Sequence, residues 1–558
     1  IKPDFVQAHN NLGNIYKDLE QSESAIQSYK KAIEIKPDFA EAHNNLGSIF
    51  NDLKQLDKAI DAFEKAIVLK SNFAEAHNNL GNSFRDLGRF DGAVKYYEQA
   101  IDIKPDYVLA HNNLGFVLMG LGEINKAILC FKTATIIKPD YAEAHNYLGN
   151  AFNILGEIRN GVLCYEKAIE INPDFAIAHN NLGNVFKDLN QLDDALKSYE
   201  KAMNLEPDLD NVLGNILSTK MNSCNWEGVE SLLIDLRDKI TSNQKVVNPF
   251  TLLGLIDDSA LQLKACEFAM NDNHPKSNDL EPIEPYPKHQ KIRIGYFSGD
   301  FREHPVAFLS AELYEAHDRD HFEIHAFSFG PDTNDEMNLR IKAGVDYFHE
   351  VHAKAPKHIA ELARSLEIDI AVDLTGFTAE ARTDIFAMSA APLQVNYLAY
   401  AGSMGLDYID YIMADHMVIP KEEQSHYLEK IAYLPDSFMV NDTKNKVSTR
   451  EFTREEAGLP EKGFVYSCFN HHYKITPIVF NSWMKILSQV EGSVLWLSDG
   501  NNTGISNLKN EADKLGIDSK RFVVVPVATV QEFRHQSIKV IDKYLEQPED
   551  KRKPMMFV

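Results

Sequence analysis

Two short loops in the second half of the chain combine residue types that favour an anionic ligand. The first, residues 299–305, contains His304 and ends in proline; the second, residues 470–477, contains Lys474 and ends in Thr-Pro. Proline suits the first turn of a helix and threonine caps one, so each loop is expected to lead into a helix. A helix amino terminus presents unpaired amides and a positive dipole, to which Lys474 adds a charge. The loops therefore predict a site for a negatively charged ligand; the alternative is that each is an ordinary exposed loop.

The elements that must position these loops follow a βαβ pattern. Short apolar runs alternate with amphipathic stretches from residue 292 onward, which favours parallel sheets covered by helices. Each loop follows the first strand of a series, at the edge where open α/β sheets bind ligands. Two doubly wound, Rossmann-like domains with a cleft between them are expected. The predicted strands are residues 292–298, 322–329, 368–374, 393–398 and 411–414, then 464–469, 493–498 and 522–527.

The first part of the chain is built from repeats of 34 residues. The phrase His-Asn-Asn-Leu-Gly begins at His9 and returns at residues 43, 77, 111 and 179, with His-Asn-Tyr-Leu-Gly at 145. A small residue, an aromatic residue and a closing proline recur at fixed places, as at Gly13, Tyr29 and Pro37. This is the tetratricopeptide pattern of two closely packed helices, so an α-solenoid with repeats starting at residues 6, 40, 74, 108, 142 and 176 is expected. The repeated histidines are interpreted as packing or surface residues.

A row of polar residues lies beside the core positions of the repeats. Asparagines adjoin the core leucine and aspartates follow seven residues later, so both types share a face of the first helix. Side-chain amides can bind any peptide backbone, which predicts a peptide-binding groove. The alternatives are that the asparagines cap or bridge neighbouring helices, or reflect repeat duplication. The groove residues are Asn11, Asn45, Asn79, Asn113 and Asn181 with Asp18, Asp52, Asp86 and Asp188; Tyr147 interrupts the row.

Composition limits the class of protein. With 44% hydrophobic and 25% charged residues, the 558-residue chain has the composition of a soluble globular protein. A net charge of -25 argues against nucleic acid as a partner, and no apolar run is long enough to span a membrane. Five scattered cysteines without a C-x-x-C pair indicate neither a disulfide framework nor zinc, and favour a cytoplasmic protein. Ile1 is not a start methionine, so the repeat array is expected to begin earlier.

Between the repeats and the α/β domains the helical pattern continues without repeats up to about residue 273. Residues 274–290 contain four prolines, which forbid helix and mark a linker. We therefore expect a repeat array at 1–209, a connector and linker at 210–290, and α/β domains at 291–445 and 446–558.

In combination these motifs resemble the protein O-GlcNAc transferase family, including its bacterial members. The resemblance covers nearly everything from Ile1 to about Val527. Beside the repeats it rests on Cys224-Asn225-Trp226, Ile294-Gly295-Tyr296, Asp300-Phe301, His304-Pro305, Asp373-Leu374-Thr375-Gly376, Ala391-Pro392-Leu393-Gln394, Phe469-Asn470 and Tyr473-Lys474-Ile475. It implies a GT-B-type pair of Rossmann-like domains and an inverting transfer of N-acetylglucosamine from UDP-GlcNAc to serine or threonine of proteins held by the repeats. It also implies that no metal or other cofactor is needed.

The resemblance further implies roles for single residues. Lys474 would neutralise charge on the departing UDP, and His304 would position or deprotonate the acceptor hydroxyl. Asp373 and Gly402 would shape the sugar pocket. Asn470, His471 and Ala528 would contact the donor, with Ala528 and its neighbour Val527 meeting the uracil. No Asp-x-Asp motif ends a strand, which is consistent with a metal-free site.

The chain also departs from the family pattern. Phe377 stands where many members have histidine or tyrosine, Ser389-Ala390 replaces Arg-Pro, and residues 399–403 read Ala-Tyr-Ala-Gly-Ser instead of Gly-Tyr-Pro-Gly-Thr. After Val527 a charged tail replaces the His-Thr-Thr loop that binds UDP phosphates, so the second domain is expected to be incomplete. Two alternatives remain: a repeat-based interaction scaffold with impaired catalysis, and a protein O-fucosyltransferase using GDP-fucose, against which the His304-Pro305 pair argues.

Overall fold

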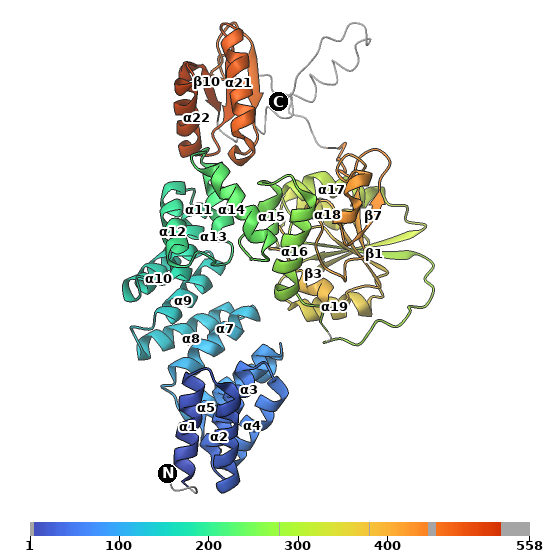
Figure 1. The fold of residues 1–558 in the computed structure, drawn as a ribbon. Coiled ribbons are helices and arrows are strands. Elements are labelled where there is room, and N and C mark those ends of the chain that lie inside the picture. Colours follow the sequence, from blue (N-terminus) through green and yellow to red (C-terminus); the bar gives the residue numbers. More distant parts are fainter. Residues whose placement is uncertain (1–4, 278, 379, 445–452, 526–558) are drawn as a thin grey trace. The chain divides into compact units, whose positions relative to one another are not determined.

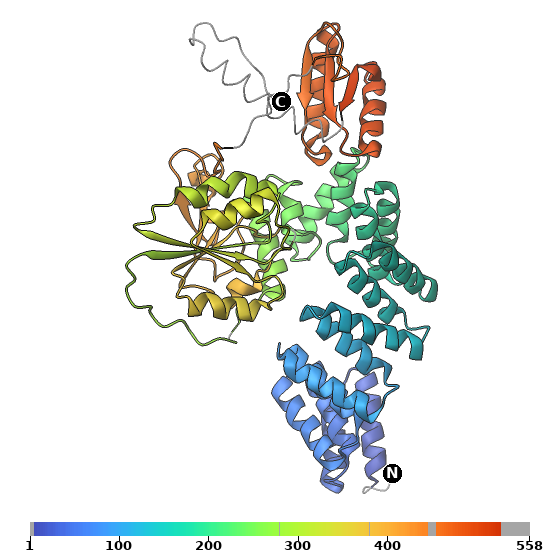
Figure 2. The ribbon, with the colours of Figure 1, turned by 180° about the vertical axis from the view of Figure 1, so that it is seen from behind.

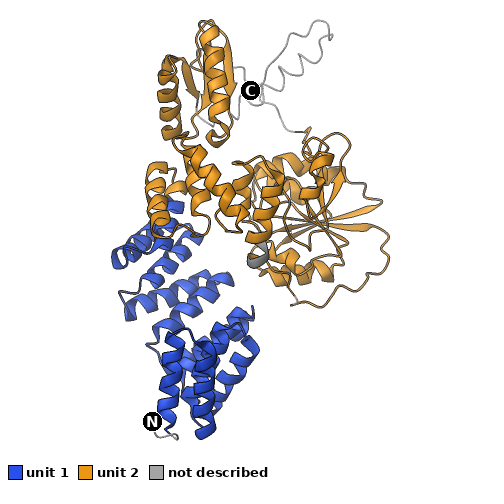
Figure 3. Ribbon diagram, in the orientation of Figure 1, with its two compact units in different colours: residues 1–185 blue, residues 186–558 orange. Residues whose placement is uncertain are grey.

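The computed structural model describes residues 5–277, 279–378, 380–444 and 453–525 (Figure 1). It separates into two compact units, residues 1–185 and 186–558 (Figure 3). The first unit is helical, and the second holds the last repeat helix, the connector and two parallel sheets. The expected order of an α-solenoid followed by α/β domains is confirmed.

Each repeat is a pair of helices, and the first helix of each begins at the predicted residue. Short turns separate the paired helices. The pairs are α1 (Val6–Asp18) with α2 (Ser22–Ile35), α3 (Ala40–Asp52) with α4 (Leu56–Leu69), α5 (Ala74–Asp86) with α6 (Phe90–Ile103), α7 (Val108–Gly120) with α8 (Ile124–Ile137), α9 (Ala142–Ile154) with α10 (Ile158–Ile171), and α11 (Ala176–Asp188) with α12 (Leu192–Leu205).

The glycine of the repeated phrase lets an aromatic ring lie directly on the first helix. A Cβ on Gly81 would approach the Tyr97 ring to 2.7 Å, and one on Gly47 would approach the Phe63 ring to 2.7 Å. Both rings are fully buried. The repeated phrase is therefore first a packing device, because each glycine makes room for the main core residue of its repeat.

The connector is helical, as the sequence pattern indicates. It contains α13 (Val212–Asn222), α14 (Val229–Thr241), α15 (Pro249–Leu253) and α16 (Ser259–Asn273). The described residues of the linker after α16 form no helix. His289, near the linker's end, pairs through Nε2 with Glu367 (2.9 Å) and through Nδ1 with Asp369 (3.1 Å), which fixes the linker to the larger sheet.

Seven parallel strands form the larger sheet, in the order β3-β2-β1-β4-β5-β6-β7. Helices α17 and α18 cover one face and α19 and α20 the other, with a separate hydrophobic core on each side (Figures 1 and 2). The doubly wound prediction is confirmed for this sheet. Its elements are β1 (Ile292–Ser298), α17 (Pro305–Ala316), β2 (Phe322–Ser328), α18 (Glu336–Gly344), β3 (Tyr347–Glu350), α19 (Pro356–Ser365), β4 (Ile370–Asp373), α20 (Asp384–Ala387), β5 (Leu393–Asn396), β6 (Tyr411–Ala414), the 3-10 turn η1 (Lys421–His426) and β7 (Lys430–Tyr433).

Three parallel strands form the smaller sheet, in the order β10-β9-β8. One face packs on α21 and α22 through residues such as Phe480, Trp483 and Leu508, and Ala457 lies on the other. Its elements are β8 (Val465–Cys468), the 3-10 turn η2 (His472–Lys474), α21 (Pro477–Gln489), β9 (Val494–Ser498), α22 (Asn502–Lys514), the 3-10 turn η3 (Ser519–Arg521) and β10 (Phe522–Val525).

Candidate active site

The loop after β1 delivers His304 to the start of α17. His304 is the residue immediately before the helix, and Pro305 opens the helix as the sequence predicts. The imidazole Nδ1 lies 3.3 Å from the backbone amide of Val306, and the side chain is 38% exposed. His304 is thus held at the carboxyl edge of the sheet with part of its ring facing solvent, where a substrate hydroxyl could reach it.

Asp300 in the same loop belongs to a motif of the family resemblance, Asp300-Phe301, but the sequence indicated no role for it in the site. Its carboxylate is buried and lies 3.5 Å from His304 Nδ1 and 3.7 Å from Arg302 Nη2. Burial raises the pKa of Asp300, and the positive charges of His304 and Arg302 partly offset that rise. Arg302 in turn donates to both carboxylate oxygens of Glu380 at 3.2 Å. The four-residue spacing between Asp300 and His304 was the available signal, but it says nothing about burial.

Asp373 ends β4 next to β1 in the sheet, since it pairs in register with Phe297 of β1 and Asn396 of β5. Its Oδ1 accepts hydrogen bonds from the backbone amides of Thr375 (2.8 Å) and Gly376 (3.1 Å), so it shapes the turn that follows the strand. The side chain is fully buried, and this burial raises the pKa of its carboxyl to about 6.

Two buried polar atoms lie near this turn. Thr375 Oγ1 and Asn396 Oδ1 have no hydrogen-bond partner in the part of the chain that the structure describes. Asn396 Nδ2 donates to the carbonyl of Tyr400 (3.0 Å), which begins the loop carrying Gly402. Unpaired buried acceptors and donors are costly, so this edge of the sheet suits a polyhydroxylated ligand that would pair them.

The loop of Gly402 is held by hydrogen bonds to the buried carboxylate of Glu429. Ser403 Oγ donates to Glu429 Oε2 (2.7 Å), and the backbone amide of Met404 donates to Oε1 (2.6 Å). A Cβ on Gly402 would approach the Tyr400 hydroxyl to 2.8 Å. His304, Asp373 and Gly402 therefore belong to loops at one edge of the larger sheet, as the topology of β1, β4 and β5 requires.

The raised pKa of Asp373 predicts a measurable pH dependence of stability. Its folded value of about 6 exceeds the ordinary 3.8, so between these pH values the folded chain holds a proton that the unfolded chain has released. Stability from this group is fully present below about pH 4 and falls as pH rises to 6. Asp373→Asn keeps an acceptor for the two amides, so it should remove the fall and stabilise the domain by about 3 kcal/mol at pH 7.

Hydrogen exchange of the β4 amides at pH 4.5 and pH 7 reports this sheet separately from the rest of the chain. The expected gain in protection for Asp373→Asn is about 3 kcal/mol at pH 7 and only about 1 kcal/mol at pH 4.5, where the folded carboxyl is still protonated. An equal gain, or a loss, at both pH values would contradict the assignment.

The second loop places Lys474 just ahead of α21. Lys474 and His471 are exposed, and His471 stacks on Tyr473 with ring centroids 6.0 Å apart. Asn470 Nδ2 makes a long contact with Cys468 Sγ (3.8 Å). Thr476 caps α21 by accepting from the amide of Val479 (3.3 Å), as predicted. No carboxylate pairs with Lys474 among the described residues, so its charge is available to a ligand.

His472 supports this loop from inside, a role that the sequence did not reveal. It is buried, and its Nδ1 accepts from Asn501 Nδ2 (2.8 Å), which also donates to the carbonyl of Asn222 at the end of α13 (2.9 Å). Asn507 Nδ2 donates to the neighbouring carbonyl of Ser223 (2.8 Å). The loop of Lys474 thus rests on the connector, and contacts so distant in sequence leave no local pattern.

The structure does not join the two predicted groups of site residues directly. No hydrogen bond or ion pair within the described ranges links Asn470, His471 or Lys474 to the loops of the larger sheet. Ala528 and Val527 lie outside the described residues.

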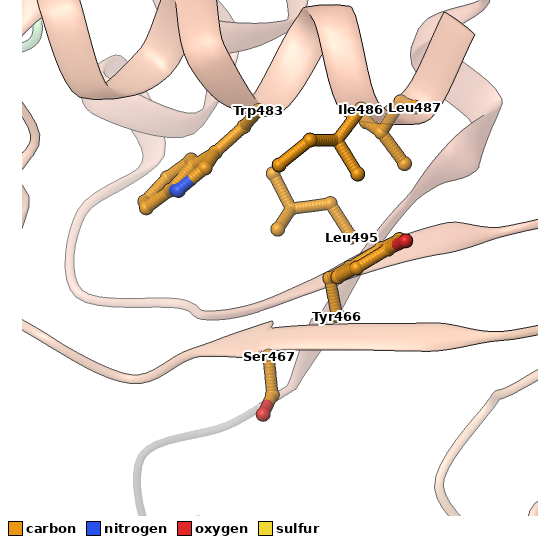
Figure 4. A pocket seen from close by; sticks show the side chains of 6 residues that line it. All are labelled: Tyr466, Ser467, Trp483, Ile486, Leu487 and Leu495. Carbon is orange, nitrogen blue, oxygen red and sulfur yellow. The ribbon is translucent and has the colours of Figure 1, made fainter. Parts of the chain in front are cut away.

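A cavity of about 10 Å³ lies between α21 and the smaller sheet (Figure 4). Its lining includes Trp483, Leu487 and Leu495. This volume is at the limit of one water molecule, so the cavity is a packing gap.

The asparagine row of the repeats bridges neighbouring helices. Asn45 Nδ2 donates to Asn10 Oδ1 (3.1 Å) and Asn14 Oδ1 (3.2 Å) of the preceding repeat, and Asn14 also accepts from the Tyr29 hydroxyl (2.8 Å). Equivalent bonds run from Asn79 to Asn44, from Asn113 to Asn78 and Asn82, and from Asn181 to Asn146 and Asn150. Bridging, one of the alternatives left open by the sequence, is therefore present in the structure. The side chains of Asn45, Asn79, Asn113 and Asn181 are partly exposed.

Two aspartates of the row form ion pairs. Asp52 pairs with Lys17 (3.2 Å), and Asp86 with Arg85 (2.8 Å). Asn11 is exposed. Tyr147 packs between the rings of Phe116 and Phe131. Five of the repeated histidines donate to the turn before their own helix, as His43 Nε2 does to the Pro37 carbonyl (3.0 Å); the others are His77, His111, His145 and His179.

Comparison with known protein families matches both halves of the chain. The sequence model of glycosyl transferase family 41 matches residues 282–451 and 446–548, the region that carries both loops. The α/β part of the chain therefore matches glycosyl transferase family 41. Tetratricopeptide repeat models match from residue 13 to 190 and over 176–209.

Curated relatives of the chain include plant and animal proteins. It is 33% identical to the probable UDP-N-acetylglucosamine–peptide N-acetylglucosaminyltransferase SEC of Arabidopsis thaliana, over 46% of the chain and 27% of the relative. Identity to the probable UDP-N-acetylglucosamine–peptide N-acetylglucosaminyltransferase SPINDLY of Petunia hybrida is 27%, over 45% of the chain and 28% of the relative. The chain thus spans little more than a quarter of the length of these relatives.

A solved mutant structure of the Thermobaculum terrenum O-GlcNAc transferase resembles the fold. The TM-score is 0.50 at 23% identity, over 75% of this chain and 74% of the other. This likeness concerns the fold alone, and it agrees with the expected repeats followed by two Rossmann-like sheets. In the described part of the chain, no helix is both long enough and apolar enough to cross a membrane.

Proposed function

We propose that the chain transfers N-acetylglucosamine from UDP-GlcNAc to serine or threonine hydroxyls of proteins. The proposal rests on the arrangement of the region that matches family 41. His304 and the Asp373 turn share one edge of the larger sheet. Lys474 precedes α21 and has no carboxylate partner among the described residues. The chain's relatives are named for this donor and for peptide acceptors.

In the proposed reaction the acceptor oxygen attacks the anomeric carbon of the sugar. The bond from that carbon to the β-phosphate oxygen breaks, UDP leaves with the electron pair, and His304 Nε2 takes the hydroxyl proton. Attack opposite to the leaving group inverts the anomeric centre. Lys474 and the amides at the start of α21 supply positive charge where UDP develops negative charge, so no metal is required.

The test is a transfer assay with the purified chain, UDP-GlcNAc and a library of serine- and threonine-containing peptides, read by mass spectrometry in the presence of EDTA. A mass increase of one N-acetylhexosamine that survives EDTA is expected. GDP-fucose in a parallel reaction tests the other donor. Absence of both UDP binding by calorimetry and sugar transfer would overturn the proposal.

We further propose that the repeats hold the acceptor through the asparagine row. Asn45 uses its amide nitrogen for the bridge, while its Oδ1 receives a long contact of 3.5 Å from Asn44 and keeps acceptor capacity for a peptide amide. Asn45→Ala should weaken peptide capture about fivefold, the value of one hydrogen bond.

The matched control is Asn10→Ala, which breaks the same bridge by removing its buried partner. Equal losses in the two variants would mean that the row acts through repeat geometry, and no loss in Asn45→Ala would contradict peptide binding.

A further inference from the structure

The strongest unassigned feature is the contact between buried Asp300 and His304. The carboxylate Oδ2 lies 3.5 Å from Nδ1 of the imidazole, and only 7% of the Asp300 side chain is exposed. Two hydrogen bonds fix the backbone between Asp300 and His304. The amide of Glu303 donates to Asp335 Oδ2 (2.9 Å), and Asn338 Nδ2 donates to the carbonyl of Phe301 (2.6 Å). Asp300 and His304 are therefore held close together by fixed backbone.

The same imidazole nitrogen faces two competing partners. The amide of Val306, 3.3 Å away, is a donor, and bonding to it requires an Nδ1 without hydrogen. A neutral imidazole then carries its hydrogen on Nε2. The Asp300 carboxylate is an acceptor, and bonding to it requires hydrogen on Nδ1, which leaves Nε2 bare. The choice between Val306 and Asp300 is thus a choice of tautomer.

The proposed reaction needs the second tautomer. A hydroxyl proton can pass to Nε2 only when that nitrogen has a free electron pair, and the resulting imidazolium then has hydrogen on both nitrogens. The imidazolium would be stabilised by a carboxylate in contact with Nδ1, as in serine proteases, where an aspartate orients the catalytic histidine.

We infer that Asp300 is a positioning residue that holds His304 in the tautomer with hydrogen on Nδ1 and stabilises it when it takes the acceptor proton. This inference rests on the proposed function and assigns Asp300 a part in the same site.

The charges around Asp300 allow this role. Arg302 Nη2 lies 3.7 Å from its carboxylate and at the same time binds Glu380, and the His304 ring lies on its other oxygen. Burial and Glu380 oppose the ionised carboxylate, while His304 and Arg302 favour it, so the pKa of Asp300 depends on the charge of its neighbours. The imidazolium formed when His304 takes the acceptor proton is therefore a charge that favours the ionised Asp300.

Asp300→Asn tests the inference, because an asparagine fills the same space but is neutral and can present its amide hydrogens to Nδ1. Transfer should fall by about 10- to 100-fold, less than the roughly 100- to 10,000-fold of general base catalysis itself because His304 remains, while UDP binding is retained. The low-pH limb of the rate profile should move to lower pH, because the imidazolium loses its negative partner. A rate loss without a shift of this limb would point to a structural role and overturn the inference.

A second measurement is independent of transfer. Spectra of the full chain labelled with carbon-13 at histidine Cε1, with His304→Gln for assignment, should show His304 titrating at lower pH in Asp300→Asn. Asp318→Asn is the matched control, because Asp318 pairs with exposed His321 at 2.7 Å at the far end of the same domain. It should move the titration of His321 and leave that of His304 and the transfer rate unchanged. If the wild-type chain transfers no sugar, the proposed function fails, whereas an unmoved His304 titration overturns the role of Asp300.

Discussion

Replacing Lys474 by methionine is expected to lower the rate of sugar transfer by about 100- to 1000-fold, the usual effect of removing one group that stabilises developing charge. The side chain is exposed in front of α21, pairs with no carboxylate in the described residues, and extends from a loop fixed by His472 and Thr476. Its charge is therefore available to the phosphates of the departing UDP. Methionine keeps the length of the stem and removes the charge, so binding of UDP-GlcNAc should weaken far less than the rate.

The matched control is Lys485→Met, which removes an exposed lysine from α21 itself. Both variants change the net charge of the same domain equally. Initial rates at saturating donor and calorimetry with UDP separate the two effects. A rate loss shared by both variants would indicate a general electrostatic effect of the domain, and an unchanged rate for Lys474→Met would remove Lys474 from the mechanism.

Local sequence chemistry predicted the elements that support these residues. The strands β1 and β6 have the predicted bounds, because each is a short apolar run between turn residues. Pro305 and Pro477 open α17 and α21, since proline fixes the backbone of a first helical turn without losing a hydrogen bond. The helix starts of the repeats were equally predictable, because the same packing problem is solved every 34 residues.

Other elements left too weak a signal. The strands β3 and β7 form the two edges of the larger sheet, and each has four residues of mostly intermediate or full exposure. An edge strand needs no continuous apolar run, so Tyr-Phe-His-Glu and Lys-Ile-Ala-Tyr did not stand out. Several other strands are shorter than predicted: β4, for example, begins at Ile370 because Ile368 and Asp369 belong to the turn that binds the linker.

The site was predictable only as far as residue type decides chemistry. Lys474 and His304 could be predicted as site residues from their charge and loop position. The sequence could not show whether Asn45 bridges two repeats or binds a peptide, since either role places its side chain on the same helix face. Asp300 and His472 depend on burial, and the partner of His472 at Asn501 lies 29 residues away. Such roles arise from tertiary contacts rather than from spacing.

Gly376→Ala is the second change for which we expect a large effect. Gly376 follows the turn shaped by Asp373 and has φ +56, a conformation that costs an L-residue about 1–2 kcal/mol. A Cβ there would also collide with the Cβ of Tyr400. Tyr400 cannot move away easily, because it is fully buried, its ring packs on Phe377, and its hydroxyl meets Cys266 Sγ at 3.4 Å. Strain and overpacking together should destabilise the larger sheet by about 3 to 4 kcal/mol.

Gly492→Ala separates the two causes. Gly492 has φ +72, but a Cβ added to it would meet nothing within 4 Å, so alanine there should cost only the backbone strain, about 1–2 kcal/mol. Hydrogen exchange of β4 and β5 in Gly376→Ala, compared with that of β8 and β9 in Gly492→Ala, measures both effects in their own sheets. Similar costs in the two variants would mean that Tyr400 yields to the methyl group. A larger loss of unfolding free energy at Gly376 would show that the turn after Asp373 packs tightly against the loop of Gly402. The sugar side of the proposed site would then be preformed in the absence of the donor.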